Sequence, residues 1–310
     1  MMRLYSGSSV EGLYRQALEE CLCHQEVSNS RVGRVRDIGP ACFEVDSSVL
    51  GFPLVKGRGL NPFFLLAEAA WVLGGRNELD ILQFYLGKYG EYSDDGNTLN
   101  GAYGYRIKNS FGFNQLDAVI DELKSYPSSR RAVITLYSPW DLKKTGSKDI
   151  PCNISVLFKI RGGCLDITVF NRSNDIYMGV PYNLFIFQVI QFYVSKKLKV
   201  PLGWQRHISD SLHLYERDVN SVERVLGHGR DSLVDVLKKK SGFELCEELV
   251  EGYGKINSRQ FDDLSGGFLI RAFKSFCEFR EGRKKDILSL SRSDDIIGYA
   301  VNDWLQVHYG

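Results

Sequence analysis

The 310-residue chain lacks the features that would direct it to a membrane or to a nucleic acid. No apolar run approaches the roughly 18 residues that a membrane-spanning helix needs, and the first residues, Met1–Ser6, contain no signal-peptide core or cleavage site. Basic and acidic side chains number 39 and 38, so no excess charge would attract a polyanion. We therefore expect a cytoplasmic protein without a membrane or nucleic-acid partner.

Cysteine pairs at metal-binding spacing are also missing. The chain has seven cysteines, an odd number, and no repeated spacing among them. This pattern predicts reduced thiols in a reducing compartment, mostly packed as small apolar side chains, and no metal site.

Repeats, low-complexity tracts and an obvious linker are absent as well. A chain of this length can bury one substantial core or divide into two domains. We expect a catalytic core over residues 1–225 and a helical extension over residues 226–310, packed on the same domain.

Hydrophobic periodicity indicates helices and strands mixed along the chain, and hence an α/β fold. Strands are expected within residues 42–49, 133–136, 154–160 and 164–170. The first two thirds should contain helices at residues 9–23, 61–74, 78–86, 116–125 and 184–194, with loops at 30–37 and 88–104. The last third should contain helices at residues 219–226, 230–239, 243–252, 268–279, 283–292 and 294–307.

The residues that could carry chemistry concentrate between Pro151 and Tyr215. Cys152 stands at the head of the first strand of a predicted hairpin, and the cluster Arg172–Asp175 follows that hairpin. Cys152 is either a nucleophile or a core cysteine. A second feature is Glu68, alone in an apolar helix, where a buried carboxylate is costly unless it is hydrogen-bonded or functional.

The order Pro-Cys, hairpin, Arg-Ser-x-Asp, Gly-x-Pro-x-Asn and His-x-Tyr resembles the core of thymidylate synthases and their nucleotide hydroxymethylase relatives. Weaker matches extend back to about Arg31. The resemblance implies a twisted mixed sheet flanked by helices, which that family buries face to face in a homodimer. It also implies one-carbon transfer from 5,10-methylenetetrahydrofolate, a co-substrate, to C5 of a pyrimidine nucleoside monophosphate.

The same resemblance assigns the catalytic roles. Cys152 would add to C6 of the pyrimidine as a thiolate, a species that a nearby cation such as Arg172 stabilises. Glu68 would organise water and move protons around the ring, and Asp175 would support proton movement on the base and folate side. Asn153 stands where the family has a histidine, in the water network around O4.

Phosphate binding is the role implied for most of the arginines, because a dianion needs several guanidinium groups. Arg172 and Ser173 would bind it within the chain, and Arg31 would close over it from a loop, with Arg34 or Arg36 as substitutes. Arg130 and Arg131 would reach the phosphate of the partner subunit. The alternative for these basic residues is a solvated surface role.

The remaining assignments concern base, sugar and folate. Asn183 carries both a donor and an acceptor, so it can pair with N3–H and O4 of uracil, which favours dUMP over a cytidylate. His213 and Tyr215 would bind the 3′-hydroxyl of the sugar. Arg58, Tyr89 and Tyr92, together with Asp175, would line the folate side.

Three departures from the family pattern fall on the side of the site that decides between methylation and hydroxymethylation. Tyr89 and Tyr92 replace tryptophans, Asn153 replaces histidine, and the last residues, Gln306–Gly310, lack the family's short apolar tail. Reductive methylation requires a dry site while hydride is delivered, and these changes favour water instead. We therefore lean to a 5-hydroxymethyl product. Reductive methylation to dTMP, or a non-catalytic nucleotide- or RNA-binding relative, are the alternatives.

Overall fold

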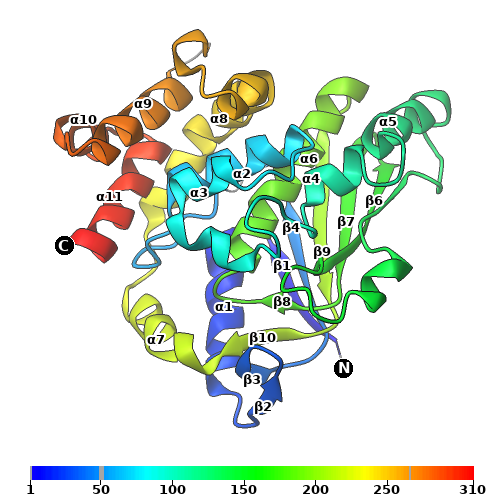
Figure 1. Cartoon of the computed structure of the whole chain (residues 1–310), viewed down its shortest axis with the longest axis horizontal. Coiled ribbons are helices and arrows are strands. Elements are labelled where there is room, and N and C mark those ends of the chain that lie inside the picture. The colour runs from blue at the N-terminus through cyan, green and yellow to red at the C-terminus, as the bar shows by residue number, and fades with distance from the viewer. Residues whose placement is uncertain (1, 49–51, 265–266) are drawn as a thin grey trace.

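A six-stranded mixed sheet organises the chain (Figure 1). The computed structural model describes residues 2–48, 52–264 and 267–310. In sheet order, the strands are β1 (Arg3–Gly7), β4 (Ala41–Asp46), β9 (Leu202–Ser209), β7 (Cys164–Asn171), β6 (Asn153–Arg161) and β5 (Val133–Thr135). The pairs β1–β4 and β7–β9 are parallel and the others antiparallel. The predicted α/β class with a mixed sheet is confirmed.

A second, four-stranded sheet lies beside the first one. Its order is β2 (Ser28–Ser30), β3 (Gly33–Asp37), β10 (Leu212–Tyr215) and β8 (Asn174–Asp175). The predicted loop at 30–37 is therefore wrong for Gly33–Asp37, which form β3, whereas Arg31 lies in the turn of the β2–β3 hairpin. The Ser30 hydroxyl stabilises that turn by donating to the Gly33 carbonyl over 2.7 Å.

Helices of the first two thirds pack on the large sheet directly or on other helices that cover it. They are α1 (Val10–Cys23), α2 (Pro62–Leu73), α3 (Asp80–Tyr85), α4 (Tyr103–Lys108), α5 (Gln115–Ser125), α6 (Val180–Leu198) and α7 (Val219–Gly227), with short 3₁₀ turns η1 (Gly87–Tyr92), η2 (Pro139–Lys143) and η3 (Glu216–Asp218). The predicted loop at 88–104 thus contains η1 and the start of α4. Asn61 begins α2 by accepting from the N–H groups of Phe63 and Phe64, both at 3.0 Å.

The last third is helical, as expected, and lies beside α2 and α3 in Figure 1. It comprises α8 (Ser232–Asn257), η4 (Phe261–Asp263), α9 (Phe268–Arg280), α10 (Lys285–Leu290) and α11 (Ile296–Tyr309). The two helices predicted between 230 and 252 are one, because the Ser-Gly step inside α8 does not interrupt it. The matched Gly51 and the side chains of Lys238–Lys240 lie outside the described parts of the chain.

One apolar cluster runs from α2 into these C-terminal helices. The ring centroid of Phe63 lies 4.7 Å from that of Phe276 on α9 and 5.6 Å from that of Trp304 on α11. Burial of such rings away from water is the main stabilising contribution to this packing. The division at residues 225 and 226 stays a prediction, because the cluster crosses it.

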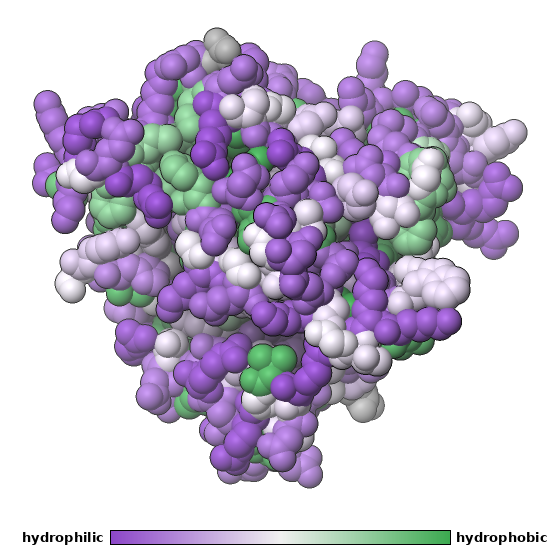
Figure 2. Space-filling model, in the orientation of Figure 1, coloured by the Kyte–Doolittle hydropathy of each residue, from purple (hydrophilic) through white to green (hydrophobic). Residues whose placement is uncertain are grey.

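The two faces of the large sheet differ in cover. Tyr5, Phe43 and Val169 are buried under the helices, which stand in front of the sheet in Figure 1. Successive strand residues point to opposite faces, so Leu4 and its cross-strand neighbours occupy the other face, where Leu4 is 60% exposed. On the helical side of the molecule, shown in Figure 2, the surface is mostly hydrophilic. None of the helices within the described residues is long and apolar enough to span a membrane.

Candidate active site

Strand topology gathers the predicted catalytic segments at one end of the large sheet. Antiparallel pairing places Asn153, at the start of β6, opposite Asn171, at the end of β7. Parallel pairing places Ser209, at the end of β9, beside Asn171. Cys152, Arg172 and the turn leading into β10 are therefore neighbours, although the sequence separates them widely.

Cys152 is held by the segment that follows β7. Its Sγ atom lies 3.7 Å from Oγ of Ser173, and its carbonyl oxygen accepts from the Arg172 N–H over 2.9 Å. The Arg172 guanidinium donates to the carbonyls of Pro151 and Ile150 over 3.1 and 3.0 Å. It also lies 3.3 Å from Ser173 Oγ, so it approaches the sulfur through that hydroxyl.

Glu68 on α2 is paired with Tyr89 of η1. The Tyr89 hydroxyl donates to Glu68 Oε1 over 3.0 Å, while Oε2 has no partner within the described residues. Part of the Glu68 side chain is open to solvent, but Oε2 itself is covered, so desolvation acts on the carboxylate. Burial raises the pKa of Glu68 to about 7, with the Tyr89 hydrogen bond opposing the rise.

Tyr103 was not predicted as a site residue, although it lies among several of them. Burial, and then the neighbouring Cys152, raise the pKa of Tyr103 well above its usual value. Asn153 opposes that rise, although the two side chains make no hydrogen bond of normal geometry. Asn153 is fully buried, and neither its Oδ1 nor its Nδ2 has a partner among the described residues. The signal in the sequence is a tyrosine between Gly101 and Gly104.

Asp175 and Asn183 are fixed by short local hydrogen bonds. Asp175 Oδ1 accepts from the N–H groups of Tyr177 and Met178 over 2.8 and 3.0 Å. Burial raises the pKa of Asp175, and these bonds oppose the rise. Asn183 donates through Nδ2 to Asn174 Oδ1 over 3.1 Å, which sets the orientation of its amide.

His213 and Tyr215 are positioned by β10, between β3 and β8. Ser211 donates to Asp37 Oδ2 over 2.6 Å and lies 3.4 Å from Nδ1 of His213. The His213 and Tyr215 rings meet edge to face, with centroids 5.2 Å apart. Arg217, another residue that the sequence analysis did not single out, lies 4.1 Å over the Tyr215 ring.

Besides Arg172, the arginines predicted to bind phosphate lie in two places: Arg31 and Arg36 belong to the β2–β3 hairpin, and Arg130 and Arg131 precede β5. Arg31 donates to the Ser147 carbonyl over 3.2 Å, which brings the β2–β3 hairpin to the segment before Cys152. Arg36, a possible substitute, is paired with Glu216. Arg130 is exposed, and the Arg131 side chain, 81% exposed, pairs with Glu122. Within the described chain, neither Arg130 nor Arg131 bonds to another predicted site residue.

Of the residues predicted on the folate side, the structure brings Tyr89 and Tyr92 into contact, but not Arg58 with them. Tyr89 and Tyr92 lie edge to face with centroids 5.5 Å apart, and Tyr92 is 51% exposed. Arg58, in contrast, is buried, with its guanidinium 3.7 Å above the Tyr177 ring. Its role as a direct folate contact stays a prediction.

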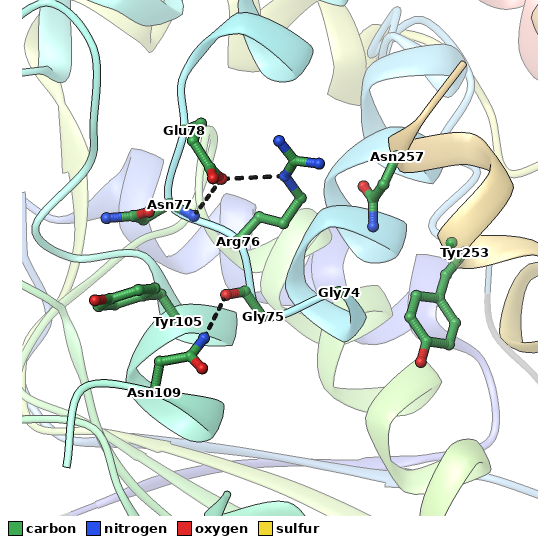
Figure 3. A pocket seen from close by; sticks show the side chains of 10 residues that line it. Gly74, Gly75, Arg76, Asn77, Glu78, Tyr105, Asn109, Tyr253 and Asn257 are labelled. Carbon is green, nitrogen blue, oxygen red and sulfur yellow. Dashed lines mark hydrogen bonds and ion pairs between the residues drawn. The ribbon is translucent and has the colours of Figure 1, made fainter. Parts of the chain in front are cut away.

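A separate concavity of about 610 Å³ lies between the end of α2, α4 and α8 (Figure 3). Arg76, Tyr105, Tyr253 and Asn257 are among the residues that line it, and none of the predicted site residues does. It is therefore not the site assembled around Cys152. In the described parts of the chain, no group of three or more His, Cys, Asp or Glu side chains is placed to hold a metal ion.

Comparison with known proteins identifies the fold family of this site. The sequence profile described as Thymidylate synthase matches residues 13–247. The chain belongs to the thymidylate synthase family. Over 229 residues it is 36% identical to a deoxyuridylate hydroxymethyltransferase of Bacillus phage SP01, covering 70% of this chain and 60% of that relative. A second relative of that name, from Pseudomonas phage M6, is 40% identical over 168 residues. The match covers 53% of this chain and 48% of that relative.

The thymidylate synthase of Enterobacteria phage T4 is more distant, at 26% identity over 218 residues, covering 65% of this chain and 71% of that one. The chain spans about half to three fifths of the length of the two hydroxymethyltransferases. Similarity within the thymidylate synthase family is therefore greater to relatives named for hydroxymethyl transfer than to this relative named for methylation.

Proposed function

We propose that this protein transfers a one-carbon unit from methylenetetrahydrofolate to C5 of dUMP and releases 5-hydroxymethyl-dUMP. The observation that carries the choice of product is the Tyr89–Glu68 hydrogen bond, together with the buried amide atoms of Asn153, which have no partner within the described residues. The names of the two more similar relatives support the same product.

Cys152 begins the proposed reaction. Its thiolate adds to C6 of uracil, and the electron pair moves to C5, which attacks the methylene carbon of the folate. Loss of the C5 proton and departure of tetrahydrofolate leave an exocyclic methylene on C5. Arg172 and Ser173 would bind the phosphate beside the sulfur, and Asn183 would read N3–H and O4 of the base.

Glu68 and Tyr89 would then handle water. A carboxylate with a pKa of about 7 can both take and return a proton near neutral pH. The Tyr89 hydroxyl donates to Glu68 and keeps oxygen lone pairs for a water molecule, whereas an indole N–H can only donate. Water would bond to the exocyclic methylene and lose a proton to Glu68, and the electron pair returning through the ring would expel the Cys152 thiolate.

Mass spectrometry tests the proposal directly. Purified protein is incubated with methylenetetrahydrofolate and, separately, dUMP, UMP, dCMP or CMP. We expect dUMP to gain a hydroxymethyl group, with tetrahydrofolate as the second product. Stoichiometric dihydrofolate and dTMP would show reductive methylation instead, and four unchanged nucleotides would support the non-catalytic alternative.

We also propose that the protein acts as a homodimer in the cytoplasm, with Arg130 or Arg131 completing the partner's phosphate site. The half-covered sheet face around Leu4, and the exposure of Arg131, support this arrangement. Mixing inactive Cys152→Ala protein with inactive Arg131→Ala protein should restore about a quarter of wild-type activity, because half the dimers are hybrids with one intact site.

The matched control mixes Cys152→Ala with Glu68→Gln. Both residues belong to the same site of one chain, so a hybrid dimer contains no additional repaired site and activity should not return. Sedimentation of the wild-type protein as a monomer would contradict the shared site.

A further inference from the structure

Hydrogen bonds attach the C-terminal helix α11 to the loop that carries Arg58. The two carboxylate oxygens of Asp303 accept hydrogen bonds from the N–H groups of Gly57 and Gly59, over 2.7 and 2.8 Å. These two peptide groups flank Arg58 on either side. One side chain of the last helix therefore fixes the backbone of Arg58 at both ends.

The loop conformation depends on this helix and on its glycines. Gly57 and Gly59 have φ angles of +77° and +61°, which side chains other than glycine rarely adopt. A Cβ atom on Gly59 would lie 2.6 Å from the Val307 side chain. A ring nitrogen of His308 lies 2.9 Å from the Gly59 carbonyl, and it must donate because a carbonyl oxygen only accepts.

Arg58 connects this loop to the candidate active site through contacts with Tyr177. Its guanidinium carbon lies 3.7 Å from the centre of the Tyr177 ring, and Nη2 donates to the Tyr177 carbonyl over 2.8 Å. The N–H of the same Tyr177 donates to Asp175 Oδ1 over 2.8 Å. A continuous series of contacts thus runs from Asp303 through Arg58 and Tyr177 to Asp175.

We propose that Asp303 is a positioning residue for the folate side of the active site, acting through Arg58 and Tyr177 on Asp175. This inference rests on the proposed function, in which Asp175 and Arg58 belong to the folate side. It gives the helical extension a role in co-substrate binding. The other explanation is that Asp303 only anchors α11 to the rest of the protein.

Asp295 provides a matched control on the same helix. Its carboxylate caps the N-terminus of α11, accepting from Ile297 and Gly298, and pairs with Arg271, away from the Arg58 loop. Asp303→Ala and Asp295→Ala should both weaken the attachment of α11 and lower the melting temperature. Only Asp303→Ala should change the site.

The kinetic readout is tritium release from 5-tritiated dUMP as methylenetetrahydrofolate is varied. Asp303→Ala should lower kcat/KM for the folate about 10- to 100-fold, since small displacements of positioned groups are that costly. The dUMP dissociation constant, measured by calorimetry, should not change. Asp303→Asn, which keeps one acceptor oxygen, should give an intermediate loss. Equal folate kinetics in the Asp303 and Asp295 variants would overturn the proposal.

A second readout does not depend on activity. Hydrogen exchange, followed by mass spectrometry, should speed up at residues 55–60 and at 175–178 in Asp303→Ala, and at neither segment in Asp295→Ala. Unchanged exchange at 175–178 would overturn the positioning role. If wild-type protein converts no nucleotide but this exchange pattern appears, the proposed function fails while the positioning series stands.

Discussion

The nucleotide side and the folate side of the site differ in how their polar groups are satisfied. Asn183, on the nucleotide side, is held by a hydrogen bond that it donates to Asn174 on the neighbouring strand β8. Glu68 Oε2, beside Tyr89 on the folate side, and both polar atoms of Asn153, in the predicted water network around O4, are covered and have no partner within the described chain. Buried polar atoms are normally paired, so such atoms mark a place for a water molecule or ligand. We therefore expect the surroundings of Asn183 to be ordered before binding, and the surroundings of Glu68 and Asn153 to be completed by water or the co-substrate.

The largest effect is expected from replacing the proposed nucleophile, which the reaction needs on both sides of the site. Cys152→Ala should reduce C5 tritium release from labelled dUMP by more than about 10⁴-fold, because no C5 carbanion forms without addition at C6. Cys164→Ala, at the other end of the same hairpin, is the matched control and should remain active. Release at the native rate by the Cys152 variant would remove Cys152 from the mechanism.

Glu68→Gln tests the folate side. We expect a loss of about 10²- to 10⁴-fold in product formation, the usual value of a positioned acid or base. In the wild type, product formation should rise with pH through about 7, as Glu68 ionises. The exposed acid Glu78, changed to Gln, should leave that profile intact. A wild-type profile without a transition near pH 7 would speak against Glu68 as the base.

The same carboxylate makes a prediction for stability. Because the pKa of Glu68 is raised from 4.5 to about 7 in the folded protein, the folded state holds that proton more tightly than the unfolded state. The free energy of unfolding should therefore fall by roughly 3 kcal/mol between about pH 4.5 and 7 and then level off. Denaturant titrations should show that Glu68→Gln removes this contribution.

Asn183→Asp tests the nucleotide side. A carboxyl group can accept from the 4-amino group of cytosine and, when protonated, donate to N3, so the preference should move from dUMP toward dCMP. A site built to hydrogen-bond a base edge discriminates by several kcal/mol, so a change of about 100-fold in the ratio of kcat/KM values is expected. If calorimetry shows that the wild type already binds dCMP more tightly than dUMP, the role of Asn183 is wrong.

The smallest effect on rate is expected at Tyr89. It is also the one that tests most directly whether the folate side admits water. Tyr89→Phe removes the hydrogen bond that lowers the pKa of Glu68, so the rise of product formation with pH should shift upward, with less than about a tenfold loss of rate. Tyr89→Trp should increase the share of dTMP among the products. Tyr92→Phe is the matched control. An unchanged product ratio in Tyr89→Trp would show that another residue admits the water.

Local patterns made much of the fold predictable. The caps and periodicity of α1 and α2, and the paired glycines between β6 and β7, were clear in the sequence, and the structure confirms these elements. The strands β1 and β9 were missed, since pairing between distant segments stabilises them and a single sequence does not display it. The α8 prediction was wrong because tertiary packing on α2 outweighs the local Ser-Gly signal.

Site residues could be predicted where they belong to continuous sequence motifs. Residues that only the fold brings to the site could not be predicted. Cys152, Ser173 and Asn183 belong to spelled-out motifs, and the structure brings Cys152 and Ser173 together. Tyr103 and Arg217 were missed because only the fold carries them to their neighbours. Arg58 was predicted at the folate, but its contact with Tyr177 and the bonds of the adjacent Gly57 to α11 join segments far apart in the sequence, which no local pattern predicts.

The sheet order has a consequence for how the chain comes to be folded. The hairpin of β6 and β7 can form as soon as its residues are made, whereas β4 pairs on one side with β9, which lies far later in the chain. Until β9 leaves the ribosome, the edge of β4 that β9 will cover stays unpaired, which favours association with other chains. Pairings between such distant segments also slow refolding. The strand that begins beside Cys152 can therefore form early, while the N-terminal strands, made first, are among the last to be built in.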